Sequence, residues 1–313
     1  MTLDQLQIFT AVAEREHVTR AAEAMDMTQS AVSAAVASLE REFGTKLFHR
    51  VGRGIVLTEG GKLFLTEARA VLNRAEAAAL AMREFSGLTR GRLEIKASQT
   101  IASHFLPEPL VEFHKSYPGL ALAVSVGNSL QVAQAIIDGE VELGFTEGPE
   151  GEASHPQLVS ELIAQDQLVM VVSTKHPWAR QKKFSVEDLA AGTWVLREDG
   201  SGTRAAFIQR LKTLGVPYDK LRIVIELPSN EAVLAAVIAD AGAAILSKSV
   251  CASALRTGTL KAMPVSLAPR AFCAVQHAER YRSRAVAAFL GILRSDATSR
   301  TATSRRHEEI RDP

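Results

Sequence analysis

The stretch that decides the fold is Thr19-Arg-Ala-Ala-Glu-Ala-Met-Asp-Met-Thr-Gln-Ser-Ala-Val-Ser-Ala-Ala-Val-Ala-Ser-Leu-Glu40. Its pattern predicts two short helices separated by a break at Asp26-Met27. We expect Thr19 to cap the first helix and Thr28 to cap the second, because a threonine hydroxyl can accept a hydrogen bond from an unpaired amide of the first turn. The apolar face of the second helix follows at spacings of four and three residues: Val32, Val36 and Leu39.

The opposite face of the second helix begins with short polar side chains. They belong to Gln29, Ser30 and Ser33. A helix with such side chains near its N-terminus suits insertion into the major groove of DNA, and two helices joined this closely cross steeply, as in a helix-turn-helix. Two amphipathic helices of an ordinary bundle would give a similar pattern, so the surrounding sequence must decide between the two interpretations.

The surrounding sequence adds a first helix over residues 3–16 and a β-wing over residues 47–58. Glycines at positions 52 and 54 suit a turn between two short strands. Arg50 and Arg53 lie in this wing, where basic side chains next to a recognition helix can contact DNA phosphates. A solvated charge cluster is the alternative. The first sixty residues hold more acidic than basic residues, so DNA binding must depend on where the charges lie.

A long helix is expected after the wing, capped by Thr58 and ending near Ser86. Apolar residues recur in it at spacings of three and four, which predicts a heptad seam and a dimerising helix. The alternative is a helix packed on its own chain. The seam consists of Leu65, Ala68, Leu72, Ala75, Ala79 and Met82.

From Arg92 onward the pattern changes to strands that alternate with helices. About ten such strands indicate an α/β architecture with mainly parallel sheets, arranged as two subdomains with a cleft between them. We therefore predict a winged helix-turn-helix domain, a linker helix with a hinge, an effector-binding domain and a disordered tail. Their boundaries are 1–58, 59–90, 91–294 and 295–313, with one subdomain over about 91–163 and 269–294 and the other over about 164–268.

Polar side chains follow several of the predicted strands and precede helices. Ligands of α/β sheets bind beyond the carboxyl ends of the strands, and helix N-termini favour anions. We therefore expect a small anion, or the anionic end of a small molecule, in the cleft. Helix capping is the alternative role for each hydroxyl. The candidate residues are Ser98, Thr100, Asn128, Ser129, Glu147, Ser201, Gly202 and Thr203.

Composition and motifs narrow the class of protein. The chain has 313 residues, 47% of them hydrophobic, and a formal net charge of +1, which fits about two to three globular domains. The two cysteines, Cys251 and Cys273, have no metal-type spacing and fit unpaired thiols in a reducing compartment. We expect a cytoplasmic protein without signal peptide, membrane span, metal or cofactor. Its scattered histidines fit no hydrolase or zinc motif, so we do not expect an enzyme.

Together these features make the chain resemble the LysR-type transcriptional regulators, from residue 3 to about 294. The motifs that carry the resemblance occur in the family order. They are Leu6-x-x-Phe9, Thr19-x-Ala21-Ala22, Thr28-Gln29-Ser30-Ala31-Val32-Ser33, Leu39-Glu40, Leu47-Phe48-x-Arg50 and Leu57-Thr58-x-x-Gly61.

The resemblance implies a winged helix-turn-helix, a homodimer formed through the linker helix, a homotetramer in most members, and an effector domain similar to periplasmic binding proteins. It also implies double-stranded DNA as a partner, contacted by Thr28, Gln29, Ser30 and Ser33, with Arg50 and Arg53 on the backbone. Where many members carry Arg, Gln or Lys, this chain has Ala34, Ala35 and Ala37. Alanine cannot hydrogen-bond a base, so DNA shape should contribute more to recognition.

The segments Gly200–Arg204 and Glu147–Pro149 are similar to those of regulators of CO2 fixation and of sulphur-oxyanion metabolism. This similarity favours an oxyanion or a phosphorylated metabolite as the effector. The alternative function is a cytoplasmic solute-binding sensor whose N-terminal helices serve only oligomerisation.

Overall fold

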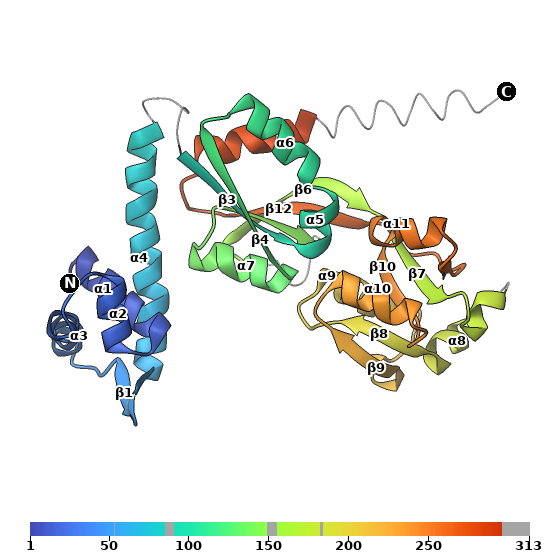
Figure 1. The fold of residues 1–313 in the computed structure, drawn as a ribbon, viewed down its shortest axis with the longest axis horizontal. Coiled ribbons are helices and arrows are strands. Elements are labelled where there is room, and N and C mark those ends of the chain that lie inside the picture. Colours follow the sequence, from blue (N-terminus) through green and yellow to red (C-terminus); the bar gives the residue numbers. More distant parts are fainter. Residues whose placement is uncertain (53, 85–90, 149–154, 182–183, 296–313) are drawn as a thin grey trace. The chain divides into compact units, whose positions relative to one another are not determined.

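The computed structural model describes residues 1–52, 54–84, 91–148, 155–181 and 184–295. Contacts between residues divide the chain into two compact units (Figure 1). The first comprises Met1–Gly87 with Asp138–Glu140, and the second comprises Leu88–Ile137 and Val141–Pro313.

Three helices form the body of the first unit: α1 (Leu3–Arg15), α2 (Val18–Ala24) and α3 (Gln29–Phe43). The Thr28 hydroxyl accepts a hydrogen bond from the Ala31 amide at 3.2 Å, which confirms the predicted cap of α3. The predicted cap at Thr19 is wrong. His17 caps α2, because its backbone is extended and its Nδ1 accepts from the Arg20 amide, so that Thr19 already lies inside the helix.

The wing consists of β1 (Phe48–Val51) and β2 (Gly54–Leu57), which pair in antiparallel fashion. Gly52 lies in the turn with a φ of 58°, a left-handed conformation that glycine adopts without strain. Arg53 lies outside the described residues. The Glu40 carboxylate of α3 accepts hydrogen bonds from the Leu47 amide at 3.0 Å and from Lys46. This carboxylate fixes the start of the wing against the end of α3.

The long helix α4 (Glu59–Glu84) follows the wing, and the Thr58 hydroxyl accepts from the Gly61 amide at 2.8 Å, as predicted for its cap. The predicted seam is divided. Leu65, Ala68 and Leu72 pack inside their own protomer, in the core formed with Leu6 and Phe9 of α1. The first part of the seam is therefore partly covered within its own protomer, with Ala68 buried and Leu65 and Leu72 half-buried. Met82 at the far end of the seam is exposed, as are Leu63 and Val71, which lie outside the predicted seam.

The second unit begins with a five-stranded sheet in the order β4-β3-β5-β12-β6. Helices α5, α6 and α7 connect its first strands, and α6 lies beside a C-terminal helix over residues 284–295 (Figure 1). The core between them includes Phe113, Phe145 and Phe289. The bounds are β3 (Gly91–Ser98), α5 (Gln99–His104), α6 (Pro107–Ser116), β4 (Leu120–Gly127), α7 (Ser129–Asp138), β5 (Leu143–Glu147), β6 (Leu158–Asp166) and β12 (Arg270–His277).

Two smaller sheets, β10-β7-β11 and β8-β9, form the rest of the second unit. An isolated bridge between Trp194 and Ala243 connects them, and Trp194 is fully buried in their core. The bounds are β7 (Leu168–Ser173), α8 (Val186–Ala191), β8 (Thr193–Arg197), α9 (Gly202–Thr213), β9 (Arg222–Leu227), α10 (Asn230–Ile238), β10 (Ala244–Ser247), α11 (Lys248–Arg256) and β11 (Leu260–Ala262), with short 3-10 helices at Pro177–Arg180 and Tyr218–Lys220.

The α/β fold class is confirmed, but the expectation of mainly parallel sheets is only partly correct. Strands joined through helices are parallel: β3 with β4 and β5, and β8 with β9. However, β12 runs antiparallel to β5 and β6, and β7 runs antiparallel to β10 and β11. These strands lie next to the two chain crossings between the five-stranded and three-stranded sheets, which run from β6 to β7 through Gln167 and from β11 to β12 through residues 263–269. Neither crossing contains a helix.

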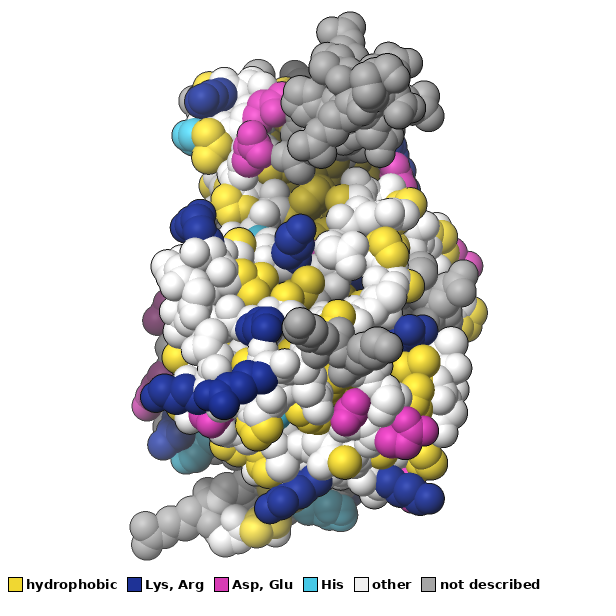
Figure 2. Space-filling view, turned by 90° about the vertical axis from the view of Figure 1, so that its right-hand side faces the viewer, with side chains coloured by type: hydrophobic (Ala, Val, Ile, Leu, Met, Phe, Trp, Pro, Cys, Tyr) yellow, Lys and Arg dark blue, Asp and Glu magenta, His cyan; other side chains and the backbone are white. Residues whose placement is uncertain are grey.

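The outer surface of the molecule mixes residue types. On the face drawn in Figure 2, hydrophobic side chains are interspersed with polar, basic and acidic ones. Among the described residues, no helix is both long enough and apolar enough to cross a membrane. Both cysteines, Cys251 and Cys273, are free and buried.

Candidate functional site

The first candidate site is the exposed N-terminal part of α3. Val32 and Leu39 are buried in the core of the first unit, which turns Thr28, Gln29 and Ser30 to the surface and leaves Ser33 half-buried. The Gln29 amide donates to the Ser33 hydroxyl at 3.1 Å. The Thr28 and Ser30 hydroxyls also hydrogen-bond each other at 3.1 Å, so the polar side chains interact in two pairs at the start of α3.

Basic and small side chains flank these pairs. Arg50 is exposed on β1 of the wing, while Ala31, Ala34 and Ala37 are exposed on α3. Because the alanine side chains are short, a partner can approach the α3 backbone closely. This geometry fits contact with DNA through a few polar groups and shape.

The second candidate site is a buried polar cluster in the second unit, centred on the Glu147 carboxylate at the end of β5. The Ser98 hydroxyl donates to Glu147 Oε1 at 2.9 Å, and the Thr203 hydroxyl donates to Oε2 at 3.1 Å. The Ser129 hydroxyl accepts from the Glu147 amide at 3.1 Å. The structure thus brings together side chains that the sequence placed in four separate loops.

The cation of the cluster is Arg270, at the start of β12. Its Nη1 forms a buried ion pair with Glu147 and donates to the Thr203 hydroxyl at 2.8 Å, while its Nε lies 2.7 Å from Asp166 Oδ2. The second Asp166 oxygen accepts from the Ser247 hydroxyl at 2.6 Å. Arg270 therefore links both of the chain crossings to the carboxylate at the centre.

Thr100 accepts a hydrogen bond from Arg270 Nη2 at 3.4 Å and extends the cluster to a second arginine. Its hydroxyl accepts from Asn230 Nδ2 at 3.0 Å, and Asn230 Oδ1 in turn accepts from Arg197 at 2.6 Å. Arg197 also pairs with Glu198 at 2.7 Å. Asn128 lies at the edge of this network, where its amide donates to the Asp199 carbonyl at 3.1 Å.

Two serines of the cluster occupy helix N-cap positions without capping. Ser98 precedes α5 and Ser201 precedes α9, and neither side chain makes a capping hydrogen bond. The Ser98 hydroxyl is directed to Glu147 instead. The alternative reading of these two serines as ordinary helix caps is therefore wrong.

Gly202 allows α9 to approach Glu147. A Cβ atom at this position would lie 2.6 Å from the Glu147 Cβ and carbonyl oxygen, closer than real contacts permit. The glycine is therefore needed for close packing of the two segments, and the N-terminal turn of α9 is held directly against the carboxylate.

The electrostatics of the cluster keep Glu147 ionised. Burial by itself raises the pKa of Glu147, but the Arg270 charge, hydrogen bonds from the Thr100 and Ser98 hydroxyls and the Arg197 charge together hold this pKa below its ordinary value. The site therefore contains an anion, contributed by the chain itself, with hydroxyl and guanidinium donors around it.

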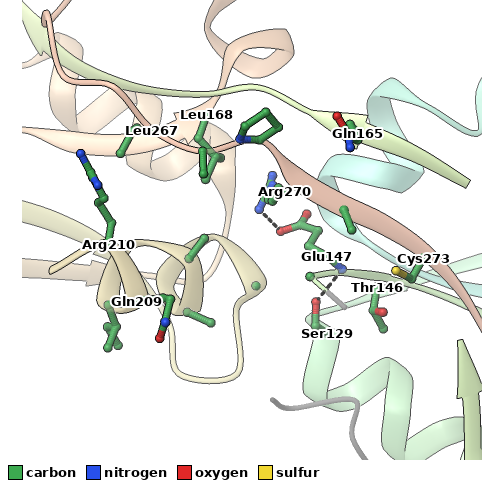
Figure 3. A pocket seen from close by; sticks show the side chains of 18 of the residues that line it. Ser129, Thr146, Glu147, Gln165, Leu168, Gln209, Arg210, Leu267, Arg270 and Cys273 are labelled. Atoms are coloured by element: carbon green, nitrogen blue, oxygen red, sulfur yellow. Dashed lines mark hydrogen bonds and ion pairs between the residues drawn. The ribbon is translucent and has the colours of Figure 1, made fainter. Parts of the chain in front are cut away.

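A cavity of about 1020 Å³ begins at this cluster. Figure 3 shows the Glu147–Arg270 pair between α9, which carries Gln209 and Arg210, and the side chains of Thr146 and Cys273. Ser129 and Gly202 also line the cavity. The Glu147–Arg270 pair, although buried, therefore borders a cavity large enough to hold a small molecule.

Sequence reasoning missed four side chains of the cluster: Asp166, Arg197, Asn230 and Arg270. Asn230 could have been found, because Ser229-Asn230 follows β9 and opens α10 in the same pattern as the loops that were chosen. Arg204 stood next to the predicted loop, but it pairs with Glu226 at 2.6 Å and does not supply the central cation. Nothing in the local sequence marks Arg270.

Comparisons with known proteins match both units. A family model for the bacterial regulatory helix-turn-helix protein of the lysR family matches residues 3–62, and one for the LysR substrate binding domain matches residues 86–298. The chain is 36% identical to YeiE of Escherichia coli (strain K12), described as an uncharacterized HTH-type transcriptional regulator, over 93% of this chain and 96% of that protein.

Solved structures show the same fold. Full-length CbnR complexed with its target DNA has a TM-score of 0.67 and 24% identity, covering 94% of this chain and 99% of that one. The regulatory domain of CcmR from Synechocystis PCC6803 in complex with 2-PG has a TM-score of 0.60 and 25% identity, covering 66% of this chain and 98% of that one. With the family models covering the two units in order, the chain belongs to the LysR family of DNA-binding transcriptional regulators.

Proposed function

We propose that this regulator binds specific DNA sequences in the cytoplasm and that a small anion bound at the Glu147 cluster controls it. One observation carries the proposal. The chain holds a carboxylate in a buried shell of hydroxyls and a guanidinium, which is the donor set that an oxyanion or a phosphate group requires.

The anion takes the place of the Glu147 carboxylate. Ser98, Thr203 and Arg270 already donate to an anionic group, and the cavity next to Glu147 offers its side chain space to turn away. An anion added beside an undisplaced Glu147 would suffer like-charge repulsion in a buried site. The effector is therefore compact at its charged end and competes with an internal carboxylate. The CcmR domain, a structural relative, was solved with 2-PG, which supports a small anionic ligand.

DNA recognition in this proposal uses α3 and the wing. Thr28, Gln29, Ser30 and Ser33 face the base edges, and Arg50 and Arg53 contact phosphates. The exposure of Gln29 and Arg50 supports this assignment. The match of residues 3–62 to a helix-turn-helix model favours it over the alternative of a solute-binding sensor with purely structural N-terminal helices.

The protein assembles as a homodimer through α4 and as a homotetramer through the second unit. Exposed Leu63, Val71 and Met82 on α4 support the first contact. Two strands support the second, because β4 and β9 each lie at a sheet edge and expose apolar side chains. An exposed apolar edge strand is normally covered by another chain segment or by a second chain.

Anion binding acts by changing how the sheets of the second unit meet. The cluster joins β3 and β5 of the large sheet to α9 and to both chain crossings, so replacement of Glu147 by a free anion alters contacts on every side. The anion shifts the balance between two arrangements only by its difference in affinity for them.

The test is calorimetric titration of the full-length protein with inorganic phosphate, sulfate, sulfite and phosphoglycolate. We expect one member of the panel to bind once per chain and to raise the melting temperature. Thr203→Ala should weaken this binding about ten-fold by removing a donor, whereas Thr213→Ala, at the opposite end of α9, should not. Equal affinity in Thr203→Ala and wild type would refute the assignment.

A further inference from the structure

We propose that the cavity beside the Glu147 cluster is a second ligand site, which takes an organic anion with an apolar body such as a medium-chain or aryl carboxylate. The site is distinct from the oxyanion position and would give the regulator a second input. The size of the cavity, its apolar walls and the two cations that line it support such a site.

The cavity is too large for the anion proposed above. Its volume of about 1020 Å³ lies at the upper end of the range for pockets that enclose drug-sized ligands. A sulfate or phosphate ion fills only a small part of such a space. The remaining space calls for a ligand with a carbon skeleton.

The Glu147–Arg270 pair separates the two sites. Glu147 and Arg270 line the cavity, whereas Ser98, Thr100 and Thr203 do not. The hydroxyl donors of the oxyanion position are therefore not open to the cavity, whereas both members of the ion pair are, as Figure 3 shows for Glu147 and Arg270. A molecule in the cavity would contact the pair without reaching those hydroxyls.

Apolar side chains from three segments form much of the wall. Leu162 of β6, Leu168 at the start of β7 and Leu267 in the second chain crossing all line the cavity. Leu162 leaves 59% of its surface exposed although it faces this hollow. An apolar ligand body would remove this leucine surface from water, which is favourable in proportion to the buried area.

Unpaired cations set the charge of the ligand. Arg210 and Lys212 of α9 line the cavity, and within the described part of the chain neither of them has an ion-pair partner. The Arg210 side chain is half-buried, so part of its guanidinium can face the cavity. In Figure 3 the Arg210 side chain rises from α9 toward Leu267. A ligand carboxylate would give these two cations an ion-pair partner, and charge-assisted hydrogen bonds of this kind are stronger than neutral ones.

The position of the site predicts coupling to the oxyanion position. Its walls come from α9, which packs against β8 and β10, and from β6 of the large sheet. A ligand that touches both sides favours the arrangement in which they face each other. Because Glu147 and Arg270 belong to both sites, occupation of either site alters the affinity of the other, and this coupling is reciprocal.

The experiment uses 8-anilinonaphthalene-1-sulfonate, a fluorescent apolar anion, titrated into the full-length protein, with octanoate as competitor. We expect saturable binding at one site per chain. Arg210→Ala should weaken it about ten-fold by removing a charged donor, and Leu162→Gln about three-fold by removing apolar contact. Both residues are partly exposed, so the variants should fold, which their melting temperatures will verify.

Matched controls lie away from the cavity: Arg256→Ala on α11 and Val186→Gln on α8, both exposed. They should bind the probe as wild type does. Undiminished binding by Arg210→Ala and Leu162→Gln, or an equal loss in the controls, would overturn the proposal. Thr203→Ala, which impairs only the oxyanion position, should retain probe binding. Loss of sulfate or phosphate binding with the probe still bound would therefore count against the first site alone.

Discussion

Arg270 and Glu147 form an ion pair in which each side chain leaves less than 5% of its surface exposed. Such a pair gains little net stability, because removing both charges from water is costly, but breaking it leaves a buried charge without compensation. Arg270 also holds Asp166, and hydroxyls surround Glu147. The pair is therefore stable only as part of a larger network. In such a network a free anion can replace the Glu147 carboxylate as the partner of Arg270.

Glu147→Gln tests this exchange directly. The substitution keeps the side-chain size and removes the internal anion, so we expect the unfolding free energy to fall by about 2 kcal/mol, less than for a wholly unpaired buried charge because Asp166 remains. The same variant should bind its anion more tightly than wild type, because the competitor is gone. Denaturant unfolding with and without sulfate or phosphate measures both effects. Weaker anion binding by the variant would contradict the proposed exchange.

The pH dependence of stability should report the same carboxylate. The pKa of folded Glu147 lies below its ordinary value of 4.5, so the unfolded chain binds more protons between these two values. The contribution of Glu147 to the free energy of unfolding is therefore fully present above about pH 4.5. It is lost as the pH falls through the pKa of the folded state. Comparison of wild type with Glu147→Gln isolates this contribution from those of other carboxylates. Identical pH profiles of the two proteins would show that Glu147 does not contribute.

Gly202→Ala should disrupt the cluster sterically. The added methyl group would meet the Glu147 backbone at 2.6 Å, so α9 must move, with an expected loss of about 1–3 kcal/mol. Anion affinity should fall with it. Gly291→Ala is the matched control, because a Cβ atom there meets no other atom within 4 Å. The melting temperatures of the two variants are compared. An unchanged melting temperature of Gly202→Ala would argue against the close approach of α9 to Glu147.

Ser33→Arg should change DNA recognition without changing ligand binding. Ser33 is half-buried on α3 and accepts a hydrogen bond from Gln29, so a long charged side chain would both break this contact and project from the helix. Duplexes selected from a random pool by wild type and variant should differ in sequence. Anion affinity serves as the control and should remain the same. Identical selected sequences would remove Ser33 from the interface.

The sequence by itself determined the elements whose formation depends on neighbouring residues. Apolar spacing predicted α3 and α4, and the hydroxyls of Thr28 and Thr58 predicted their starts, because a helix cap acts over only three residues. The same local rule failed at Thr19, since His17 can accept a similar hydrogen bond two residues earlier. The order of motifs was sufficient to identify the family.

Only the tertiary structure decided which polar groups meet. Arg270 pairs with Glu147 across 123 positions of sequence, and Asn230 bonds Thr100 across 130. It also decided that Leu65, Ala68 and Leu72 pack within their own protomer. Contacts at such separations depend on how sheets and helices stack, and the chemistry of a single arginine does not specify its partner. Periodicity records which face of a segment is apolar, but the identity of the surface that covers it arises only when the whole chain folds.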